Sequence, residues 1–222
     1  MAFHPGQYTE WTLGLPKTDS RGNRRYFTLA SSPTEEHIHL GVKFYPEPSA
    51  FKQALSGMEP GNSVFISPTA GDFTLPGNPN AKLAFLAGGI GITPVCAMAR
   101  HLAAKGVPWT LHYAARSRDA AAFIDALLPL NGAVHLHFDD EAGALIDVAA
   151  AVRQAPAGVH LYCCGPEGMI AAFLAATADR PAETVHVEHF GALAPVPGDG
   201  GLVVELARSG RVIEVAADQT IL

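Results

Sequence analysis

The sequence has few cysteines: three in 222 residues, and two of them, Cys163 and Cys164, are neighbours. Because adjacent cysteines rarely pair, a disulfide framework of the kind found in small secreted proteins is excluded. Apolar runs approaching the roughly 20 residues of a membrane helix are also missing. So is a signal peptide, in which charged residues precede an apolar stretch. These absences predict a cytoplasmic protein with reduced thiols.

Positive charge is scarce as well. Fifteen Lys and Arg residues stand against 21 Asp and Glu residues, and the basic residues are scattered. Without a basic stripe a nucleic-acid partner is not expected, although backbone amides can still hold a phosphate-bearing cofactor. The ten histidines form no H-E-x-x-H segment and no Cys/His pair at zinc spacing, so no metal site is predicted. Asp139, Asp140 and Glu141 are expected in a solvated loop.

The chain up to about Pro79 is typical of a β-rich domain. Clusters rich in Gly, Pro, Asn and Ser bound short runs of aromatic and branched residues. The predicted strands are Gln7–Leu15, Arg25–Ala30, His37–Tyr45 and Ser63–Ser67. Between the last two, apolar residues recur at helical spacing after Ser49, a residue suited to the N-cap. We therefore predict an antiparallel barrel or sandwich with one short helix over residues 1–78.

Apolar strands alternate with helices over residues 79–192. The predicted strands are Leu83–Ala87, Trp109–Ala114, Val134–Phe138, Val159–Cys163 and Val185–Glu188. The predicted helices are Pro94–Ala104, Ala120–Leu128, Leu145–Arg153 and Glu167–Thr177. This alternation indicates βαβ units and a doubly wound parallel sheet. Residues 193–222 are predicted to hold a Pro/Gly linker and a β-hairpin from Leu202 to Ala216.

Glycines cluster where the first of these strands leads into its helix, in Gly88-Gly89-Ile90-Gly91-Ile92-Thr93-Pro94. Backbone amides there can approach a pyrophosphate, and the helix dipole favours its negative charge. A proline suits the first helical turn. A tight turn that needs positive φ is the alternative. Three glycines in four positions exceed what such a turn needs, so a phosphate-binding loop is favoured.

Two further segments contain residues that could contact a bound ligand. Cys163-Cys164-Gly165-Pro166 lies at another strand end, where parallel sheets bind ligands. Its second thiol could pack against a ring, or both cysteines could be buried apolar residues.

In Arg25-Tyr26-Phe27-Thr28, alternation sends the first and third side chains to one face and the other two to the opposite face. An Arg can pair with a phosphate and an aromatic ring can lie against a planar ligand, but by itself this segment favours an ordinary amphipathic strand.

Together and in this order, these segments resemble those of the ferredoxin-NADP reductase superfamily, and the resemblance covers nearly the whole chain. Arg25–Thr28 is similar to its flavin motif, which is Arg, any residue, Tyr or Phe, then Ser or Thr. Gly88–Pro94 resembles its nicotinamide-nucleotide loop. Phe3–Tyr8 resembles the strand and turn ahead of the flavin site. Cys164–Pro166 and Glu188–Phe190 resemble its Cys-Gly-Pro segment and its closing acidic-x-aromatic strand.

The resemblance implies a flavin-binding β-barrel over residues 1–78 and an NAD(P)-binding α/β domain over 79–192. Thr28 would lie near the flavin N5, Cys164 beside the nicotinamide C4 and Glu188 near the hydride path, as catalytic residues. The implied flavin-binding residues, of which Val42 and Lys43 would lie on the strand after the motif, are Arg25, Tyr26, Phe27, Thr28, Val42, Lys43, Ser49, Ala50 and Phe51. The implied nucleotide-binding residues are Gly88, Gly89, Gly91, Thr93, Pro94, Arg116, Ser117, Cys164, Gly165, Pro166 and Met169.

The implied activity is hydride transfer from NAD(P)H to the flavin, followed by electron transfer to a redox protein, such as a ferredoxin or an oxygenase component, or to a small acceptor. FAD is favoured over FMN, because Arg25–Leu75 is most similar to FAD-binding members, although the tail is similar to FMN-dependent dioxygenase reductases. Arg116-Ser117-Arg118 could grip the 2′-phosphate of NADPH, but it also resembles NADH-using reductases, so NADH is favoured. The alternative function is a truncated, non-catalytic nucleotide-binding module. A short-chain dehydrogenase is disfavoured, because the sequence has no Tyr-x-x-x-Lys pair.

The tail from Leu202 to Leu222 resembles the first hairpin of a plant-type ferredoxin domain. Cysteines at C-x4-C-x2-C spacing are absent from the sequence, so no iron–sulfur cluster is expected in this chain. The superfamily's barrel normally has a strand or more before the turn at Pro5-Gly6-Gln7, and here only Met1–His4 precede it. We therefore expect a chain truncated at both ends, with an incomplete barrel that is left open or completed by another subunit.

Overall fold

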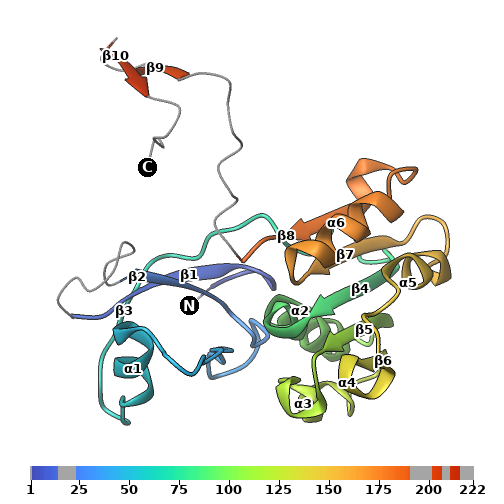
Figure 1. Ribbon diagram of the computed structural model, residues 1–222, viewed down its shortest axis with the longest axis horizontal. Coiled ribbons are helices and arrows are strands. Elements are labelled where there is room, and N and C mark those ends of the chain that lie inside the picture. Colours follow the sequence, from blue (N-terminus) through green and yellow to red (C-terminus); the bar gives the residue numbers. More distant parts are fainter. Residues whose placement is uncertain (1, 15–23, 191–201, 207–210, 216–222) are drawn as a thin grey trace. The chain divides into compact units, whose positions relative to one another are not determined.

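In the computed structural model, residues 2–14, 24–190, 202–206 and 211–215 are described (Figure 1). The chain divides into two compact units, Met1–Phe190 and Gly191–Leu222. Within the described ranges, no helix is long and apolar enough to cross a membrane.

The first unit begins with a three-stranded antiparallel sheet. Its strands are β1 (Tyr8–Thr12), β2 (Arg24–Thr28) and β3 (Phe65–Ile66), in the order β2-β1-β3. Aromatic and β-branched residues are frequent in these strands and favour the extended conformation. Helix α1 (Ala50–Ser56) starts where predicted, because Ser49 caps it by accepting a hydrogen bond from the Lys52 amide at 3.5 Å.

The predicted strand His37–Tyr45 is wrong. An isolated bridge at Leu40 is the one β-pairing in that segment. The backbone amide of Ala30 donates to the His39 carbonyl at 2.9 Å, and the His39 amide donates to the Ser31 hydroxyl at 3.2 Å. These bonds close a loop instead of extending a ladder, an arrangement that strand propensity does not reveal.

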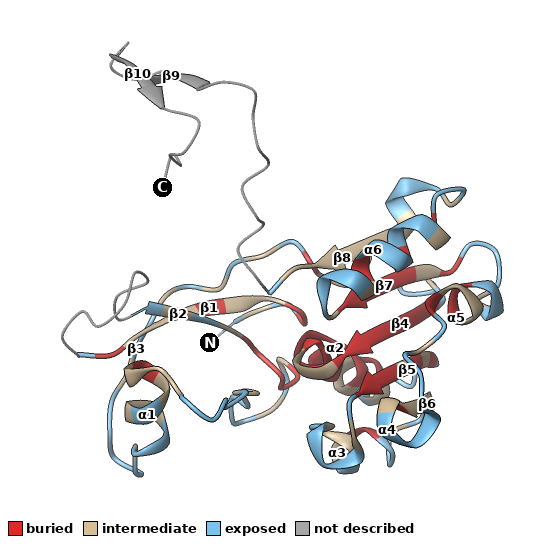
Figure 2. Cartoon of the chain, in the orientation of Figure 1, coloured by how far each residue is buried: buried red, intermediate tan, exposed pale blue. Residues whose placement is uncertain are grey.

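A five-stranded parallel sheet follows, as predicted. Its strands are β4 (Leu83–Gly88), β5 (Trp109–Ala115), β6 (Ala133–Phe138), β7 (His160–Cys164) and β8 (Val185–Glu188). Their order is β6-β5-β4-β7-β8. All six residues of the central strand β4 are buried, because the sheet is covered on both faces (Figure 2). The two sheets and their helices confirm the predicted fold class.

The main helices of this part lie close to their predicted positions. They are α2 (Ile92–Ala104), which the one-turn 3₁₀ helix η1 (Gly89–Gly91) precedes, α5 (Val148–Gln154) and α6 (Glu167–Ala176). The 3₁₀ turn η3 (Ala182–Thr184) leads into the last parallel strand. The Asp147 side chain caps α5 by accepting from the Ala150 amide at 2.8 Å.

Two predictions between β5 and α5 are wrong in detail. The helix expected over Ala120–Leu128 is reduced to η2 (Arg118–Ala120) and α3 (Ile124–Leu127), because Phe123 between them has a left-handed φ of 63°. The acidic segment expected as a loop forms the one-turn helix α4 (Asp139–Ala142). Carboxylates are favourable in a first helical turn, and Gly143 ends the helix in the left-handed conformation.

Two buried apolar clusters cover the opposite faces of the parallel sheet. One joins residues such as Phe85 and Leu111 to α2, and the other joins residues such as Leu86 to α5 and α6. The first cluster also includes Ala30 and Phe73, which precede the parallel sheet in the sequence. The antiparallel and parallel parts of the first unit therefore share one core.

The second unit contains β9 (Leu202–Leu206) and β10 (Arg211–Val215), which pair antiparallel with Leu202 opposite Val215. This pairing confirms the predicted hairpin. The predicted linker from residue 193 lies outside the described residues. The division of the chain at residues 78 and 192 stays a prediction.

Candidate functional site

The glycine loop between β4 and α2 packs against the end of β7. A Cβ on Gly91 would overlap the Cys164 carbonyl oxygen, and one on Gly88 would lie 2.5 Å from the Pro166 ring. A Cβ on Gly165 would lie 3.1 Å from the Gly88 Cα. The three glycines therefore let the backbones of two sequence motifs touch, a packing role that is separate from ligand binding.

Gly89 differs from these neighbours because it faces open space. Its φ is +52°, and nothing lies within 4 Å of the position a Cβ would take. Gly88 precedes η1 and Gly91 precedes α2, and neither residue has a side chain that could cap its helix. Open backbone at an uncapped helix start fits the phosphates of a dinucleotide.

Three of the predicted nucleotide-binding residues lie behind this loop. Thr93 and Pro94 are buried in α2, and the Thr93 hydroxyl donates to the Ile90 carbonyl at 3.0 Å. Met169 of α6 places its sulfur beside Gly88, at 2.9 Å from the position a Cβ would take. In this structure these side chains support the loop instead of lining its open side.

Cys164 and Glu188 are partners in the register of the neighbouring strands β7 and β8. Both face the same side of the sheet as Ala87, the register partner of Cys164 on β4. Burial, and then the charge of Glu188, raises the pKa of the Cys164 thiol. The thiol is therefore neutral at pH 7 and is a buried, apolar group at the strand end instead of a nucleophile.

Glu188 is half-buried, and burial raises the pKa of its carboxyl group above the ordinary value of 4.5. The nearby charge of Asp72 acts in the same direction, while His189 opposes it. A raised pKa makes this carboxyl better able to hold a proton as the pH approaches neutrality.

The alternation predicted for β2 is confirmed. The Arg25 guanidinium lies 5.2 Å from the centre of the Phe51 ring, and Phe27 meets the same ring at 6.2 Å, so both point to the side of α1. Tyr26 points to the other face, where its ring meets Tyr8 edge-on at 5.7 Å.

The Tyr26 face of the β1–β2 pair is partly open. Tyr26 is 65% exposed and its hydroxyl donates to the Glu10 carboxylate at 2.8 Å. The buried Thr28 lies two residues further along the strand, on the same face. An exposed aromatic ring followed by a hydroxyl group fits a planar, polar-edged ring system such as a flavin.

Four other residues predicted to bind the flavin lie outside β2. Val42 and Lys43 lie on an irregular segment, which corrects the strand expected for them, because the preceding loop has turned away from the ladder. The Ser49 hydroxyl is occupied as the cap of α1, where Ala50 is the first residue. Their flavin-binding roles stay predictions.

The corner after β5 carries the residues predicted to meet the adenosine ribose. Arg116 is exposed, and the Ser117 hydroxyl caps η2 by accepting from the Ala120 amide at 3.3 Å. The next residue, Arg118, lies over the Phe138 ring at 4.5 Å and pairs with the Glu141 carboxylate at 3.3 Å.

The two halves of the candidate site belong to one packed body. The Tyr162 hydroxyl of β7 donates to the Thr74 carbonyl at 2.9 Å. Ala30, two residues after Thr28, belongs to the same buried cluster as Cys164. The fold therefore brings the flavin motif and the nucleotide motifs toward one region, although Thr28 and Cys164 are 136 positions apart in the sequence.

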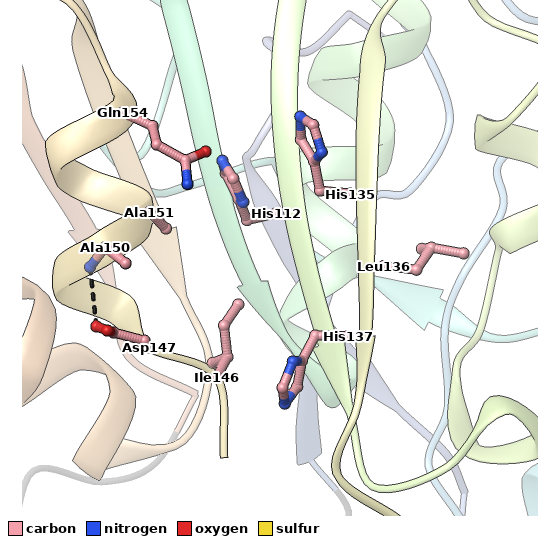
Figure 3. A pocket seen from close by; sticks show the side chains of 9 residues that line it. All are labelled: His112, His135, Leu136, His137, Ile146, Asp147, Ala150, Ala151 and Gln154. Atoms are coloured by element: carbon pink, nitrogen blue, oxygen red, sulfur yellow. Dashed lines mark hydrogen bonds between the residues drawn. The ribbon is translucent and has the colours of Figure 1, made fainter. Parts of the chain in front are cut away.

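A cavity of about 270 Å³ opens elsewhere, between β5, β6 and α5 (Figure 3). Its lining residues are His112, His135, Leu136, His137, Ile146, Asp147, Ala150, Ala151 and Gln154. It lies on the sheet face opposite Cys164, because His112 is in register with Leu86 whereas Cys164 is in register with Ala87. Among the described residues, no group of three His, Cys, Asp or Glu side chains could hold a metal ion.

A histidine pair on β7 and β8 predicts a pH-dependent stability. His186 stacks on Tyr162 at 4.2 Å, and its Nε2 lies 3.1 Å from the Nδ1 of His160. Burial, and then the charge of His160, lowers the pKa of His186 below the ordinary value of 6.5. His186 is therefore protonated more readily in the unfolded chain than in the folded chain. As the pH falls below about 6.5, this difference favours the unfolded chain and lowers the stability of the fold.

We expect His186→Asn to lose less stability than the unsubstituted protein between pH 7.5 and pH 5.5, as measured by urea unfolding at the two values. His37→Asn, in an exposed loop, serves as the control and should keep the full loss. Equal losses in both variants would show that His186 does not carry the dependence.

Known proteins resemble this chain in sequence and in structure. No family model matches the chain. It is 44% identical to the phenoxybenzoate dioxygenase subunit beta of Ectopseudomonas oleovorans, over 91% of the chain and 64% of that protein. It is 43% identical to the tetrachlorobenzoquinone reductase of Sphingobium chlorophenolicum, over 95% of the chain and 58% of that protein. The chain thus spans less than two thirds of these relatives.

Solved structures show the same likeness. Phthalate dioxygenase reductase, described as a modular structure for electron transfer from pyridine nucleotides to [2Fe-2S], superposes with a TM-score of 0.72 at 27% identity. That match covers 99% of the chain and 68% of the reductase. An intact type IV self-sufficient cytochrome P450 monooxygenase matches with a TM-score of 0.80 at 30% identity, over 100% of the chain and 28% of the monooxygenase.

Proposed function

The chain belongs to the ferredoxin-NADP reductase superfamily, and we propose that it is the flavin- and nicotinamide-binding part of an oxygenase reductase. In this role it takes electrons from NAD(P)H onto a flavin and passes them to a redox protein, such as a ferredoxin or an oxygenase component. The observation that supports the proposal is that one packed body contains the open loop at Gly89, the strand end with Cys164 and Glu188, and the flavin motif ending at Thr28.

Bound cofactors would supply the redox chemistry, since a hydride carries two electrons and one proton from the nicotinamide C4 to the flavin N5. The protein's residues would position the two rings. We propose that Thr28 offers its hydroxyl to the flavin edge and that the neutral Cys164 thiol packs against the nicotinamide. Arg25 would pair with the flavin phosphate, and Glu188 would hold a proton beside the ring.

NADH is the nicotinamide that we propose, and FAD the flavin, with NADPH and FMN as alternatives. Arg118 is already paired with Glu141, and Asp139 and Asp140 share the helix that follows β6. Carboxylates near this corner would oppose the 2′-phosphate of NADPH. A reducing, cytoplasmic setting is proposed as well, because all three cysteines are free and buried.

The decisive experiment is an anaerobic titration of the purified chain after loading with FAD or with FMN. We expect a yellow protein whose flavin absorbance is bleached by NADH, and more slowly by NADPH at equal concentration. Chromatography of the extracted flavin distinguishes FAD from FMN. A chain that binds NADH but leaves a bound flavin oxidised would instead support the non-catalytic nucleotide-binding module. A chain that binds neither flavin would refute the proposed function.

A further inference from the structure

The loop of residues 30–41, which directly follows the flavin motif, is attached to helix α2 at two points. Near its middle, the Glu35 carboxylate lies 2.6 Å from Nη1 of Arg100. At its end, Gly41 lies so close to the helix start that a Cβ would overlap the Thr93 methyl group and lie 3.1 Å from the Ile90 side chain. The loop therefore contacts both the beginning of α2 and its third turn.

Glu35 connects the helix to the interior of this loop. Its second carboxylate oxygen accepts from the Ser32 amide at 2.8 Å, and the Glu35 amide donates to the Ser32 carbonyl at 3.0 Å. The Ser32 hydroxyl lies 2.9 Å from the Thr34 hydroxyl. Because Ser31 and Ser32 are buried, a displacement of Glu35 would disturb packed residues and not a free surface turn.

Among the described residues, Glu35 is the one carboxylate that pairs with Arg100. Its side chain is only 18% exposed, and the neighbouring polar group one turn earlier is the Cys96 thiol. Burial raises the pKa of Cys96 to about 11, so this thiol is neutral at pH 7 and brings no negative charge. Removing the carboxylate would leave a largely buried guanidinium uncompensated, which favours its movement toward water.

The ion pair joins the two halves of the candidate site. Thr28 lies just before the loop, and α2 begins at the glycine loop that would hold the nucleotide. We propose that Glu35 and Arg100 are positioning residues, which rests on the proposed function, and that their ion pair sets the distance between the flavin and nicotinamide rings. Hydride transfer requires reacting atoms about 3–3.5 Å apart, so a displacement of about 1 Å affects the rate strongly.

The test is Glu35→Gln, which keeps the shape of the side chain and removes its charge. We expect single-turnover flavin reduction to slow at least about tenfold, while the affinities for flavin and NADH change by less than about threefold. Amide hydrogen exchange at Ser32 and His39 should accelerate in the same variant. Arg100→Lys, which keeps the charge, should retain part of the rate.

Glu36→Gln removes an equal charge from the exposed neighbour and should leave both the rate and the exchange unchanged. An unchanged rate in Glu35→Gln, or a loss explained entirely by weaker flavin binding, would overturn the positioning role. If Glu35→Gln does not fold, Glu35→Asp shortens the side chain with its charge intact and should show the same pattern in weaker form. If the unsubstituted chain bound no flavin, the proposed function would fail, and unchanged amide exchange in Glu35→Gln would separately refute the attachment of the loop.

Discussion

Gly91→Ala is expected both to weaken nucleotide binding and to lower the stability of the fold. The added Cβ would overlap the backbone carbonyl of Cys164, which cannot rotate away as a side chain can. Because β4 and β7 would have to separate locally, we expect a loss of about 2–3 kcal/mol in unfolding free energy. This loss corresponds to a Tm lower by roughly 4–12 °C. The Kd for NADH should rise at least about tenfold, since the open loop beside Gly91 would move. Thermal unfolding and calorimetric titration with NADH measure the two effects.

Two other glycines provide the controls for this substitution. Gly168→Ala, in α6, meets no atom within 4 Å and should leave both quantities unchanged or raise stability slightly. Gly89→Ala also meets open space but must adopt a positive φ, so a smaller loss of about 1 kcal/mol is expected. Equal losses at Gly91 and Gly168 would contradict the close approach of the two loops.

Cys164→Ala is expected to slow flavin reduction by about ten- to a hundredfold with little change in NADH affinity. The thiol is buried at the strand end beside Glu188, and its raised pKa keeps it neutral, so its proposed role is to hold the nicotinamide ring in place. Removing the sulfur leaves space in which the ring can shift. Stopped-flow reduction under anaerobic conditions, at saturating NADH, measures this effect separately from binding.

The adjacent residue gives a matched control. Cys163 is equally buried but faces the cluster that packs against α5 and α6, on the other side of the sheet. Cys163→Ala should therefore lower stability by a similar amount while the reduction rate stays close to that of the unsubstituted protein. If the two variants reduced flavin at the same rate, Cys164 would lose its place among the catalytic residues.

The glycine loop has two roles, and its sequence motif predicts only one of them. Its sequence predicts an anion-binding loop, and the open, left-handed Gly89 is consistent with that interpretation. Gly91, however, is required where two backbones meet, and a Cβ on Gly88 would collide with the Pro166 ring and the Met169 side chain. A substitution at either position would therefore alter packing as well as any ligand contact, and a loss of nucleotide binding alone would not identify a direct contact.

The sequence by itself determined the elements whose signals are local. The apolar run of β4, the alternation of Arg25 to Thr28, and the Ser49 cap of α1 each depend on neighbouring residues, so periodicity and capping rules locate them. The order of the parallel strands and of the helices α2, α5 and α6 followed for the same reason, and with it the fold class.

Only the tertiary structure decided the features that depend on distant partners. The segment His37–Tyr45 has strand propensity, but its His39 amide donates to the Ser31 hydroxyl within a loop that contacts α2. Glu35 and Arg100 are 65 positions apart, and neither belongs to a recognisable motif, so no sequence pattern could pair them. An ion pair or a backbone contact between distant segments has no local signature, because its energy arises only when the whole chain has brought both partners together.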